Sequence, residues 1–368
     1  MHRYHTSSKD SLQTLAFDSA LLSTLTPTSL RPLNTYRDTA YLLTTLPHIS
    51  SYRLSHRFLS LYLKCHGLYS AKFGYLGGIH LSLLLNRVVK LISPTKSTTR
   101  STATNTTVSP ATIVRTFFNY YATFDWANEA ATDPEIGNEK KVVRGQRDAV
   151  FIHALHTPTA RPNVASSCTV LSAQTISSQF SLAASKLAQG EWEWCLRSKD
   201  QCAKEFLGAY GAYIRIAVDM WDVNEIGGER VREVVGGIES RVVRLVVALG
   251  RIGGVQGGVW PARFHSGGDE TGEEEVEWSG FKGYYLLGIS AKDGGDVERK
   301  KLLTGKVLTA VREFETTVRQ SREIGETSGN VWVGMDLIPK KKVLEMGLVV
   351  DGRDWSLGPS SQAVRCPA

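Results

Sequence analysis

The sequence is informative first through what it lacks. It contains no run of about eighteen apolar residues, the length that a membrane-spanning helix needs. Its first ten residues, MHRYHTSSKD, lack the apolar stretch of a secretory signal. Cysteine is scarce, and the five cysteines are scattered without close pairs or metal-ligand spacing: Cys65, Cys168, Cys195, Cys202 and Cys366. This pattern argues against a disulfide framework or a zinc site, and we expect a reducing compartment, the cytosol or the nucleus.

Length and charge limit the possibilities further. A chain of 368 residues is long enough for two or three domains with a sizeable core. Its 42% hydrophobic and 21% charged residues are ordinary for a globular protein and do not favour disorder. With 43 basic and 36 acidic residues the net charge is +7. An anionic partner is therefore plausible, although charge alone does not identify one.

One stretch, residues 52–91, organises the chain. Apolar residues recur at helical spacing on both sides of a segment rich in glycine and aromatics, residues 67–78, and predict two helices joined by a turn. Gly77 and Gly78 lie where the second helix is expected to begin, and glycine there would let a ligand approach the backbone closely. Spacing alone favours a plain helical hairpin whose glycines only permit tight packing, because a single Gly-Gly pair is weak evidence for a ligand.

An arginine-bearing helix here leads to Tyr69, a glycine-rich turn at residues 74–78 and a further helix from Leu81 onward. The identity and order of these residues resemble the central domain of eukaryotic poly(A) polymerases of the fungal type, in which such a helix leads to a tyrosine, a G-[FY]-x-G-G turn and another helix. Upstream, residues 29–34 are similar to the family's R-S-L-N segment. The resemblance is specific from residue 29 to 91 and rests only on the order of elements beyond 149.

The resemblance implies an α+β protein made of two domains. A central helical bundle is expected over residues 17–148, followed by an RNA-binding domain of the RNA-recognition-like (ferredoxin-like) α+β type over residues 149–345. The remaining segments are predicted from composition: a disordered start at 1–16, a low-complexity insertion at 93–112, an acidic loop at 266–277 and a tail at 346–368.

Local patterns predict individual elements. Pro27 is expected to end a short helix that starts near Phe17, because proline breaks helices. Helical spacing predicts helices over 35–46, 170–187, 236–249 and 302–321. Apolar or alternating runs predict strands over 149–154, 210–220, 280–290 and 331–335, with 259–263 as an edge strand because of its proline.

The sequence lacks the arrangement of carboxylates that catalysis in this family would need. A nucleotidyltransferase uses carboxylates to hold two metal ions, and the family places them in an N-terminal domain that carries an Asp-x-Asp pair. This sequence has no Asp-x-Asp, and too few residues precede Phe17 to encode such a domain. We therefore expect the chain to lack the nucleotidyltransferase domain, and we predict no catalytic or metal-binding residue in it. The Mg2+ or Mn2+ that the family implies would have its ligands elsewhere.

The resemblance implies four contacts with ATP, as substrate. Asn34 matches the asparagine of R-S-L-N and could pair with an adenine edge, although a helix-capping role is an equal alternative. Tyr69 could stack on the nucleotide or bond to its phosphates, whereas a core tyrosine is the simpler interpretation. Gly78 and Ile79 match positions whose backbone approaches the nucleotide.

Two departures weaken this match. The lysine with which the family meets the triphosphate is Ser60 here, and a hydroxyl cannot supply a positive charge. Lys64, four residues later on the same helical face, is the candidate substitute, although a solvated lysine is the alternative. The asparagine that follows the family's tyrosine by two residues is Ala71 here, beside Lys72.

Basic residues could contact RNA. Phosphates would be met by lysine and arginine in a salt-dependent, sequence-independent manner. A solvated surface is the alternative for each of the candidates, which are Lys140, Lys141, Arg144, Arg147 and Lys340.

The function implied by the resemblance is that of a polynucleotide adenylyltransferase. Such an enzyme adds AMP from ATP to RNA 3′ ends during mRNA 3′-end processing in the nucleus. The implied partners are ATP, RNA 3′ ends or poly(A), and 3′-end processing factors; neither a membrane nor DNA is expected. Activity of this chain alone is not expected, and the alternative is a non-catalytic RNA-binding or scaffold protein derived from a poly(A) polymerase.

Overall fold

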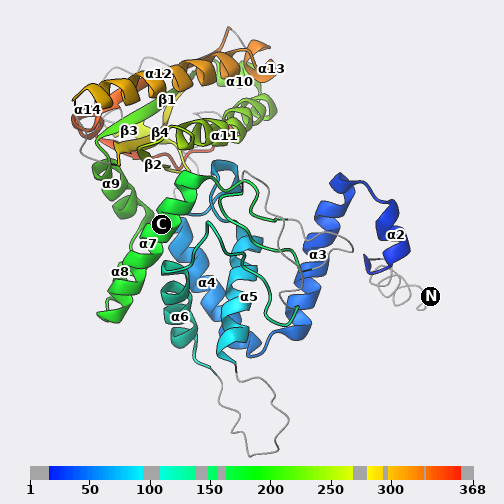
Figure 1. Ribbon diagram of the computed structural model, residues 1–368. Coiled ribbons are helices and arrows are strands. Elements are labelled where there is room, and N and C mark those ends of the chain that lie inside the picture. The colour runs from blue at the N-terminus through cyan, green and yellow to red at the C-terminus, as the bar shows by residue number, and fades with distance from the viewer. Residues whose placement is uncertain are drawn as a thin grey trace, which may run out of the picture. The chain divides into compact units, whose positions relative to one another are not determined.

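The protein is a mixture of helices and one antiparallel sheet (Figure 1). The computed structural model describes residues 16–93, 108–136, 148–155, 163–267, 280–292, 297–326 and 329–357. Helices make up the N-terminal part, and a six-stranded sheet with helices makes up the C-terminal part. The predicted α+β class is confirmed.

The described residues fall into two compact units that alternate along the sequence. The first unit consists of the described residues within 1–61, 76–166 and 177–191. The second unit consists of the described residues within 62–75, 167–176 and 192–368. Two helices, α4 (Ile49–Cys65) and α7 (Val170–Ala188), contribute residues to both. The division into domains at residue 148 stays a prediction.

The first unit contains α2 (Ser19–Thr24), α3 (Pro27–Thr45), α5 (Gly78–Ile92), α6 (Pro110–Ala122) and part of α4 and α7. The predicted short helix is confirmed as α2, which ends at Thr24 before Pro27, but Pro27 also begins α3, which was not predicted. Proline is favoured in the first turn because its missing N–H needs no partner there, and the Thr26 hydroxyl oxygen accepts the N–H of Ser29. Similarly, Ser109 caps α6, which begins inside the predicted insertion at 93–112; residues 94–107 of that insertion lie outside the described residues.

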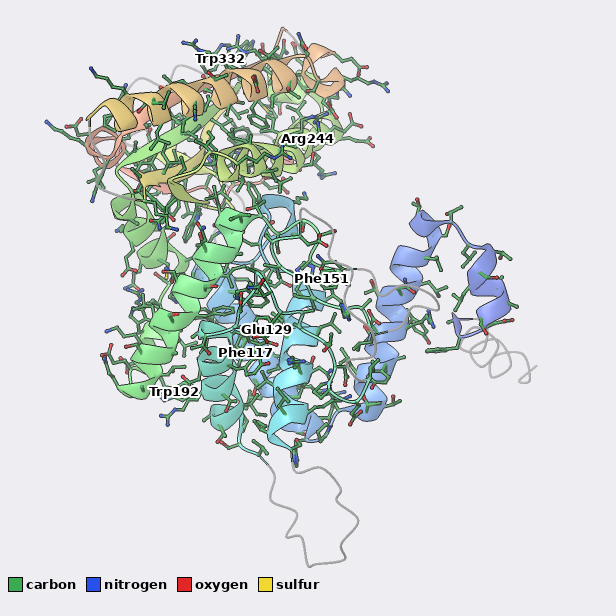
Figure 2. All side chains as sticks on the ribbon, in the orientation of Figure 1. Phe117, Glu129, Phe151, Trp192, Arg244 and Trp332 are labelled. Atoms are coloured by element: carbon green, nitrogen blue, oxygen red, sulfur yellow. The ribbon has the colours of Figure 1, made fainter. Side chains whose placement is uncertain are left out.

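Aromatic side chains form the core between α6 and α7. Phe117, which is labelled in Figure 2, and Phe118 each pack edge-on against Phe180, with ring centroids 5.5 Å apart in both pairs. The buried Tyr121 hydroxyl donates to the carbonyl of Leu84 in α5 at 3.0 Å. This contact satisfies the one polar atom of an otherwise apolar cluster.

The predicted strand at 149–154 was wrong. Isolated bridges join Ile152 to Ala131 and His153 to Asn163, and no ladder forms. The side chain of Asn163 takes the place of a neighbouring strand: its Oδ1 accepts the N–H of Ile152 at 3.1 Å and its Nδ2 donates to the carbonyl of Val150 at 2.8 Å. The apolar run therefore reflects burial, because Val150, Phe151 and Ile152 are all buried, and not strand pairing.

The second unit is built on the sheet. Its strands are β1 (Ala212–Met220), β2 (Val255–Val259), β3 (Phe264–Ser266), β4 (Phe281–Ala291), β5 (Val331–Pro339) and β6 (Leu348–Val350). The order is β5-β1-β4-β3-β6, with β2 also paired to β4, and every pairing is antiparallel. The strands predicted at 210–220, 280–290 and 331–335 are confirmed, and β5 runs four residues further than expected.

Two long helices give this sheet its topology. They are α11 (Gly228–Gly250), between β1 and β2, and α12 (Val297–Arg319), between β4 and β5. The sequence β1-α11-β2-β4-α12-β5 with spatial order β5-β1-β4-β2 is the ferredoxin-like arrangement. The helices predicted at 236–249 and 302–321 are confirmed, and α11 begins eight residues earlier than expected because half of its first eight residues are charged.

The opposite face of the sheet is partly covered by α9 (Lys199–Ala209) and α14 (Lys340–Glu345). Leu207 of α9 and Val343 of α14 are buried in one cluster with Tyr213, Leu286 and Ile338 of the sheet. The shorter elements of this unit are α8 (Trp192–Cys195), α10 (Val223–Ile226), α13 (Arg322–Gly325), η1 (Ala71–Phe73) and η2 (Trp355–Leu357).

Two further predictions in this unit were wrong. Residues 259–263 do not form a strand of their own: β2 ends at Val259, Pro261 lies in a bend, and β3 resumes at Phe264. Because proline has no N–H to donate, Pro261 interrupts the strand. The interruption separates β2 from β3, so no single strand covers residues 259–263. The segment predicted as a tail from residue 346 includes β6, which pairs with β3.

A buried ion pair stabilises the first unit. Lys90 Nζ of α5 lies 2.7 Å from Asp133 Oδ2 and 2.8 Å from Glu135 Oε2, and it donates to the Tyr41 hydroxyl of α3 at 3.3 Å. The side chains of Lys90 and Asp133 are only 3% and 0% exposed. Burial by itself lowers the pKa of Lys90, but the hydrogen bonds to Asp133 and Glu135 outweigh it and raise that pKa. Asn86 Nδ2 also donates to Asp133 at 2.7 Å.

Replacing Lys90 by methionine tests this pair. The side chain keeps its length, but Asp133 loses its counter-charge, and the free energy of unfolding should fall by about 3–5 kcal/mol. Urea unfolding followed by circular dichroism measures the change. The control is Lys341→Met, which removes an 88% exposed lysine that lies 3.8 Å from Glu345; we expect less than about 1 kcal/mol there. Equal losses in the two variants would contradict the assignment.

Candidate functional site

The turn between α4 and α5 needs glycine at one position. Gly74 has φ of 82°, a left-handed conformation that other residues rarely adopt. A Cβ at Gly74 would also lie 3.0 Å from Ser172 Oγ and 3.2 Å from the Ser167 carbonyl oxygen. Gly77, with φ of −125°, has an extended backbone open to any residue, and it directly precedes α5, as predicted.

The start of α5 is held by a neutral histidine. The Gly77 N–H donates to His80 Nδ1 at 3.0 Å, so that nitrogen carries no proton, and His80 Nε2 donates to the Val164 carbonyl at 2.8 Å. Burial lowers the pKa of His80, in agreement with a neutral ring. The N–H groups of Gly78 and Ile79 therefore begin a well-anchored helix, and helix N-termini favour anions.

A chain of polar side chains connects α4 to the start of α5. The Ser82 hydroxyl donates to the Gly78 carbonyl at 2.9 Å, so its oxygen accepts from His56 Nε2 at 3.1 Å. His56 Nδ1 is then left to accept from the Ser60 hydroxyl at 3.5 Å. Burial lowers the pKa of His56. Ser60, which stands where the resembled family has its lysine, is thus connected to Gly78 through neutral groups.

Lys64 and Tyr69 are brought together at the end of α4. Lys64 is exposed, and its Nζ lies 5.3 Å from the centroid of the half-buried Tyr69 ring, a cation–π distance. The lysine is in the last turn of α4, where a positive charge is favoured by the helix dipole. A positive charge and an aromatic face thus form one small surface.

Asn34 lies within α3, on a half-buried surface. Its Oδ1 accepts from Arg37 Nη1 at 3.2 Å, and the Arg37 guanidinium lies 5.5 Å from the Phe17 ring centroid. Burial lowers the pKa of Arg37, while neighbouring Asp38 acts to raise it. Asn34 therefore does not cap a helix, and its oxygen already has a donor.

The five predicted ATP contacts form two groups. Asn34, Gly78 and Ile79 belong to the first unit, and Lys64 and Tyr69 belong to the second. Sequence reasoning missed His56, although its position four residues before Ser60 on one helix was a usable signal. The ATP-binding roles of these residues stay predictions.

Lys72 has a structural partner. Its Nζ lies 3.5 Å from Glu239 Oε2 of α11, and the other oxygen of Glu239 accepts from the Tyr285 hydroxyl at 2.8 Å. Phe73 packs against the same tyrosine with ring centroids 6.0 Å apart. The residues that follow Ala71 thus attach η1 to the sheet-bearing unit.

The basic candidates for RNA binding are only partly described. Lys140, Lys141, Arg144 and Arg147 lie outside the described residues. Lys340 is exposed at the start of α14, and Lys341 and Lys342 next to it are also exposed. Their contact with RNA stays a prediction.

The aromatic side chains in the centre of the sheet are buried and not accessible to ligands. RNA-recognition domains stack bases on aromatic side chains of an open sheet face. Here Tyr213, Phe264 and Tyr284 are at most 5% exposed, within the cluster formed with α9 and α14. Stacking on these three rings is therefore excluded in this conformation.

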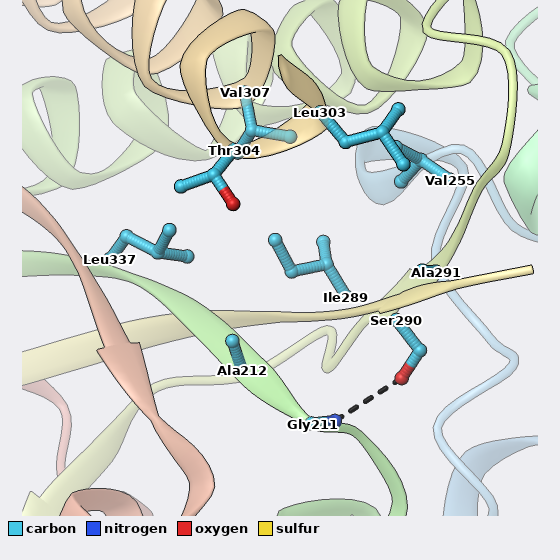
Figure 3. Close-up of a pocket in the computed structure, with 10 residues that line it drawn as sticks. All are labelled: Gly211, Ala212, Val255, Ile289, Ser290, Ala291, Leu303, Thr304, Val307 and Leu337. Carbon is cyan, nitrogen blue, oxygen red and sulfur yellow. Dashed lines mark hydrogen bonds between the residues drawn. The ribbon is translucent and has the colours of Figure 1, made fainter. Parts of the chain in front are cut away.

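Two hollows in the second unit differ in character. A cavity of about 290 Å³ between α12 and the sheet is lined mostly by apolar side chains such as Ile289, Leu303 and Leu337, so it offers no charge to a phosphate (Figure 3). A cleft of about 540 Å³ is lined by arginines. Of these, Arg230 bonds to Glu233 and Glu326, and Arg322 bonds to Glu326, so much of the positive charge is already neutralised.

The described residues do not fit a catalytic metal ion. No group of three or more histidine, cysteine, aspartate or glutamate side chains among them is placed to hold one. We therefore derive no step through Mg2+ or Mn2+. Within the same residues, no helix has the length and apolarity that crossing a membrane requires.

Comparison with known proteins relates the chain distantly to a protein of known activity. No family model matches the chain. Over 246 residues, 63% of this chain, it is 27% identical to a poly(A) polymerase from Dictyostelium discoideum. The chain is distantly similar to a poly(A) polymerase. The match covers 27% of the length of that relative, so the activity, substrates and partners of a whole poly(A) polymerase come to this chain only as proposals.

His66 lies next to the Lys64–Tyr69 surface in the sequence. Its ring stacks on Tyr62 with centroids 4.2 Å apart and lies 4.7 Å from Trp194. Burial, assisted by the charge of Arg197, lowers the pKa of His66 to about 4. The folded chain therefore holds this histidine neutral at pH 5, whereas the unfolded chain protonates it below about pH 6.5.

This difference makes stability depend on pH. Because the folded pKa is lowered, the contribution is complete above about pH 6.5 and is lost as the pH falls toward 4. Wild type and His66→Gln should be unfolded with urea at pH 7 and pH 5. The stability advantage of the wild type should shrink by about 2 kcal/mol between them. An advantage that does not change with pH would show that His66 titrates normally.

Proposed function

We propose that this chain provides nucleotide-contacting and RNA-binding parts of a poly(A) polymerase-type protein that works in the nucleus. The observation that carries the proposal is the Lys64–Tyr69 pair followed by the Gly74 turn and the α5 start at Gly78, in the order of the resembled family. The distant similarity to a poly(A) polymerase supports it. The reaction would be addition of AMP from ATP to an RNA 3′ end.

Each predicted contact has a chemical role in this proposal. The Tyr69 ring offers a face or a hydroxyl to ATP, and Lys64 beside it offers positive charge to a phosphate. The first N–H groups of α5, at Gly78 and Ile79, suit a phosphate oxygen. Asn34 would pair with the adenine edge after releasing Arg37.

Transfer of AMP needs a part that the described residues do not supply. In this family Mg2+ or Mn2+ would stabilise the charge on the reacting phosphate. No described group fits such an ion. We therefore propose that the chain alone binds ATP and RNA but does not transfer AMP. Carboxylates from a nucleotidyltransferase part would complete the enzyme.

A second candidate is a non-catalytic RNA-binding or scaffold protein. Ser60 in place of a lysine, linked to a histidine of lowered pKa, favours it, because neither of these two groups supplies a positive charge to a triphosphate. The two candidates differ in one property: the first requires ATP binding, and the second does not.

Calorimetric titration with Mg-ATP separates them. Wild type should bind ATP, and Lys64→Ala should weaken binding about tenfold, because one charged contact with a phosphate is lost. Tyr69→Phe should keep affinity if the ring stacks and lose it if the hydroxyl bonds to phosphate. Lys306→Ala, on an exposed position of α12, is the matched control and should bind as wild type.

Oligo(A) binding completes the test. A chain that binds oligo(A) but not ATP would be the scaffold candidate, and a chain that binds neither would contradict the whole proposal. Primer extension by this chain alone, with Mg-ATP and an oligo(A) primer, would contradict the claim that transfer requires a further part.

A further inference from the structure

We propose that the end of the sheet around the exposed Trp332 is a stacking platform for a base of single-stranded RNA. The platform is formed by Trp332, Lys282, Arg215 and Asp219, named here the Trp332 patch. The inference rests on the proposed function, because that function makes RNA the partner, and it adds the place and the mode of binding.

Trp332 has an unusual position for a large aromatic residue. It lies on β5, the edge strand of the sheet, and is 46% exposed (labelled in Figure 2). A Cβ at Gly334 would overlap the six-membered ring of this indole. The six-membered ring therefore lies over Gly334, where a larger residue would leave it no room, and nearly half of the Trp332 side chain is open to solvent.

Strand register defines which residues surround the ring. Asp219 of β1 is directly opposite Trp332 of β5, and Lys282 of β4 is directly opposite Asp219 on its other side. Residues that pair directly share a face of the sheet. Ile338, six residues after Trp332, is on this same face and packs under α9 and α14. Those two helices therefore cover one end of the face, and the Trp332 patch is at the other end.

The charges of the patch are almost balanced. Arg215 forms a two-bond pair with Asp336, at 2.9 and 2.7 Å, and its guanidinium lies 5.5 Å from the centroid of the Tyr284 ring. Burial raises the pKa of Asp219, while Lys282 and Arg215 act to lower it. Lys282 is exposed. Stacking would thus supply most of the affinity, and Lys282 is the cation best placed for a phosphate.

This combination fits a nucleobase better than a protein partner. Every base has a flat face, and stacking on an aromatic side chain is worth about 1–3 kcal/mol per base. A protein hot spot is instead a tryptophan surrounded by packed, desolvated neighbours. Around Trp332 the same face presents Asp219, Lys282 and Asp336, which are charged and at least partly accessible.

Fluorescence anisotropy with a labelled 15-nucleotide oligo(A) tests the platform. At 100 mM salt, Trp332→Ala should weaken binding by about 5- to 150-fold, the loss of one stacked base. Trp332→Phe should retain most of the affinity because an aromatic face remains. Gly334→Ala should weaken binding by lifting the indole from the sheet. The control is Leu302→Ala, which truncates a 61% exposed side chain on α12.

The salt dependence separates stacking from charge. Trp332→Ala should leave the slope of log affinity against log salt unchanged, whereas Lys282→Ala should reduce its magnitude by about 1. Thermal unfolding of each variant confirms that the fold is retained.

Three results would overturn the inference. If wild type binds oligo(A) and Trp332→Ala binds equally well, the platform is wrong while the proposed function stands. If Trp332→Ala changes self-association in sedimentation but not RNA affinity, the patch belongs to a protein interface. Failure of the wild type to bind oligo(A) at 50 mM salt would overturn both the proposed function and this inference.

Discussion

The left-handed turn at Gly74 is the constraint on which the motif segment depends. It lets the chain leave η1 and direct Tyr75 into the core of the sheet-bearing unit, where the tyrosine is buried and its hydroxyl oxygen accepts the N–H of Val259 at 3.2 Å. The thiol of Cys168 donates to the Tyr75 carbonyl at 3.7 Å. Three residues later α5 begins in the other unit. The resembled motif therefore has a structural role in the fold, apart from the ligand contacts that we propose for it.

Much of the fold could be predicted from residue pattern alone. The central strands and the long helices were found because each carries a sustained period of two or of three to four residues. The failures have local causes. Proline can stand both after the end of a helix and in the first turn of the next one. Pro27 therefore marks a helix boundary, but the sequence does not show whether a helix ends or begins there. The backbone of the apolar run at 149–154 is hydrogen-bonded by the Asn163 side chain instead of by a neighbouring strand, a tertiary contact that no local pattern contains.

The candidate site could be predicted only where the order of residues along the sequence indicates it. Tyr69 and the glycine turn follow from the resemblance, whereas Lys64 was inferred from its position four residues after Ser60 on the same helical face. The structure brings this lysine to the tyrosine ring. The hydrogen-bonded chain from Ser60 through His56 to Gly78 depends on how α4 meets α5. The surroundings of Trp332 depend on strand register, which determines the face that each side chain shares. Neither could be predicted from spacing within one segment.

Photoaffinity labelling tests the central claim most directly. The chain would be irradiated with 8-azido-ATP in the presence of Mg2+, and the modified peptides identified by mass spectrometry. The account predicts labelling within residues 60–80, suppressed by excess ATP and reduced in Lys64→Ala. Labelling confined to other parts of the chain, or no ATP-protected labelling at all, would contradict the assignment of this segment as a nucleotide-contacting surface.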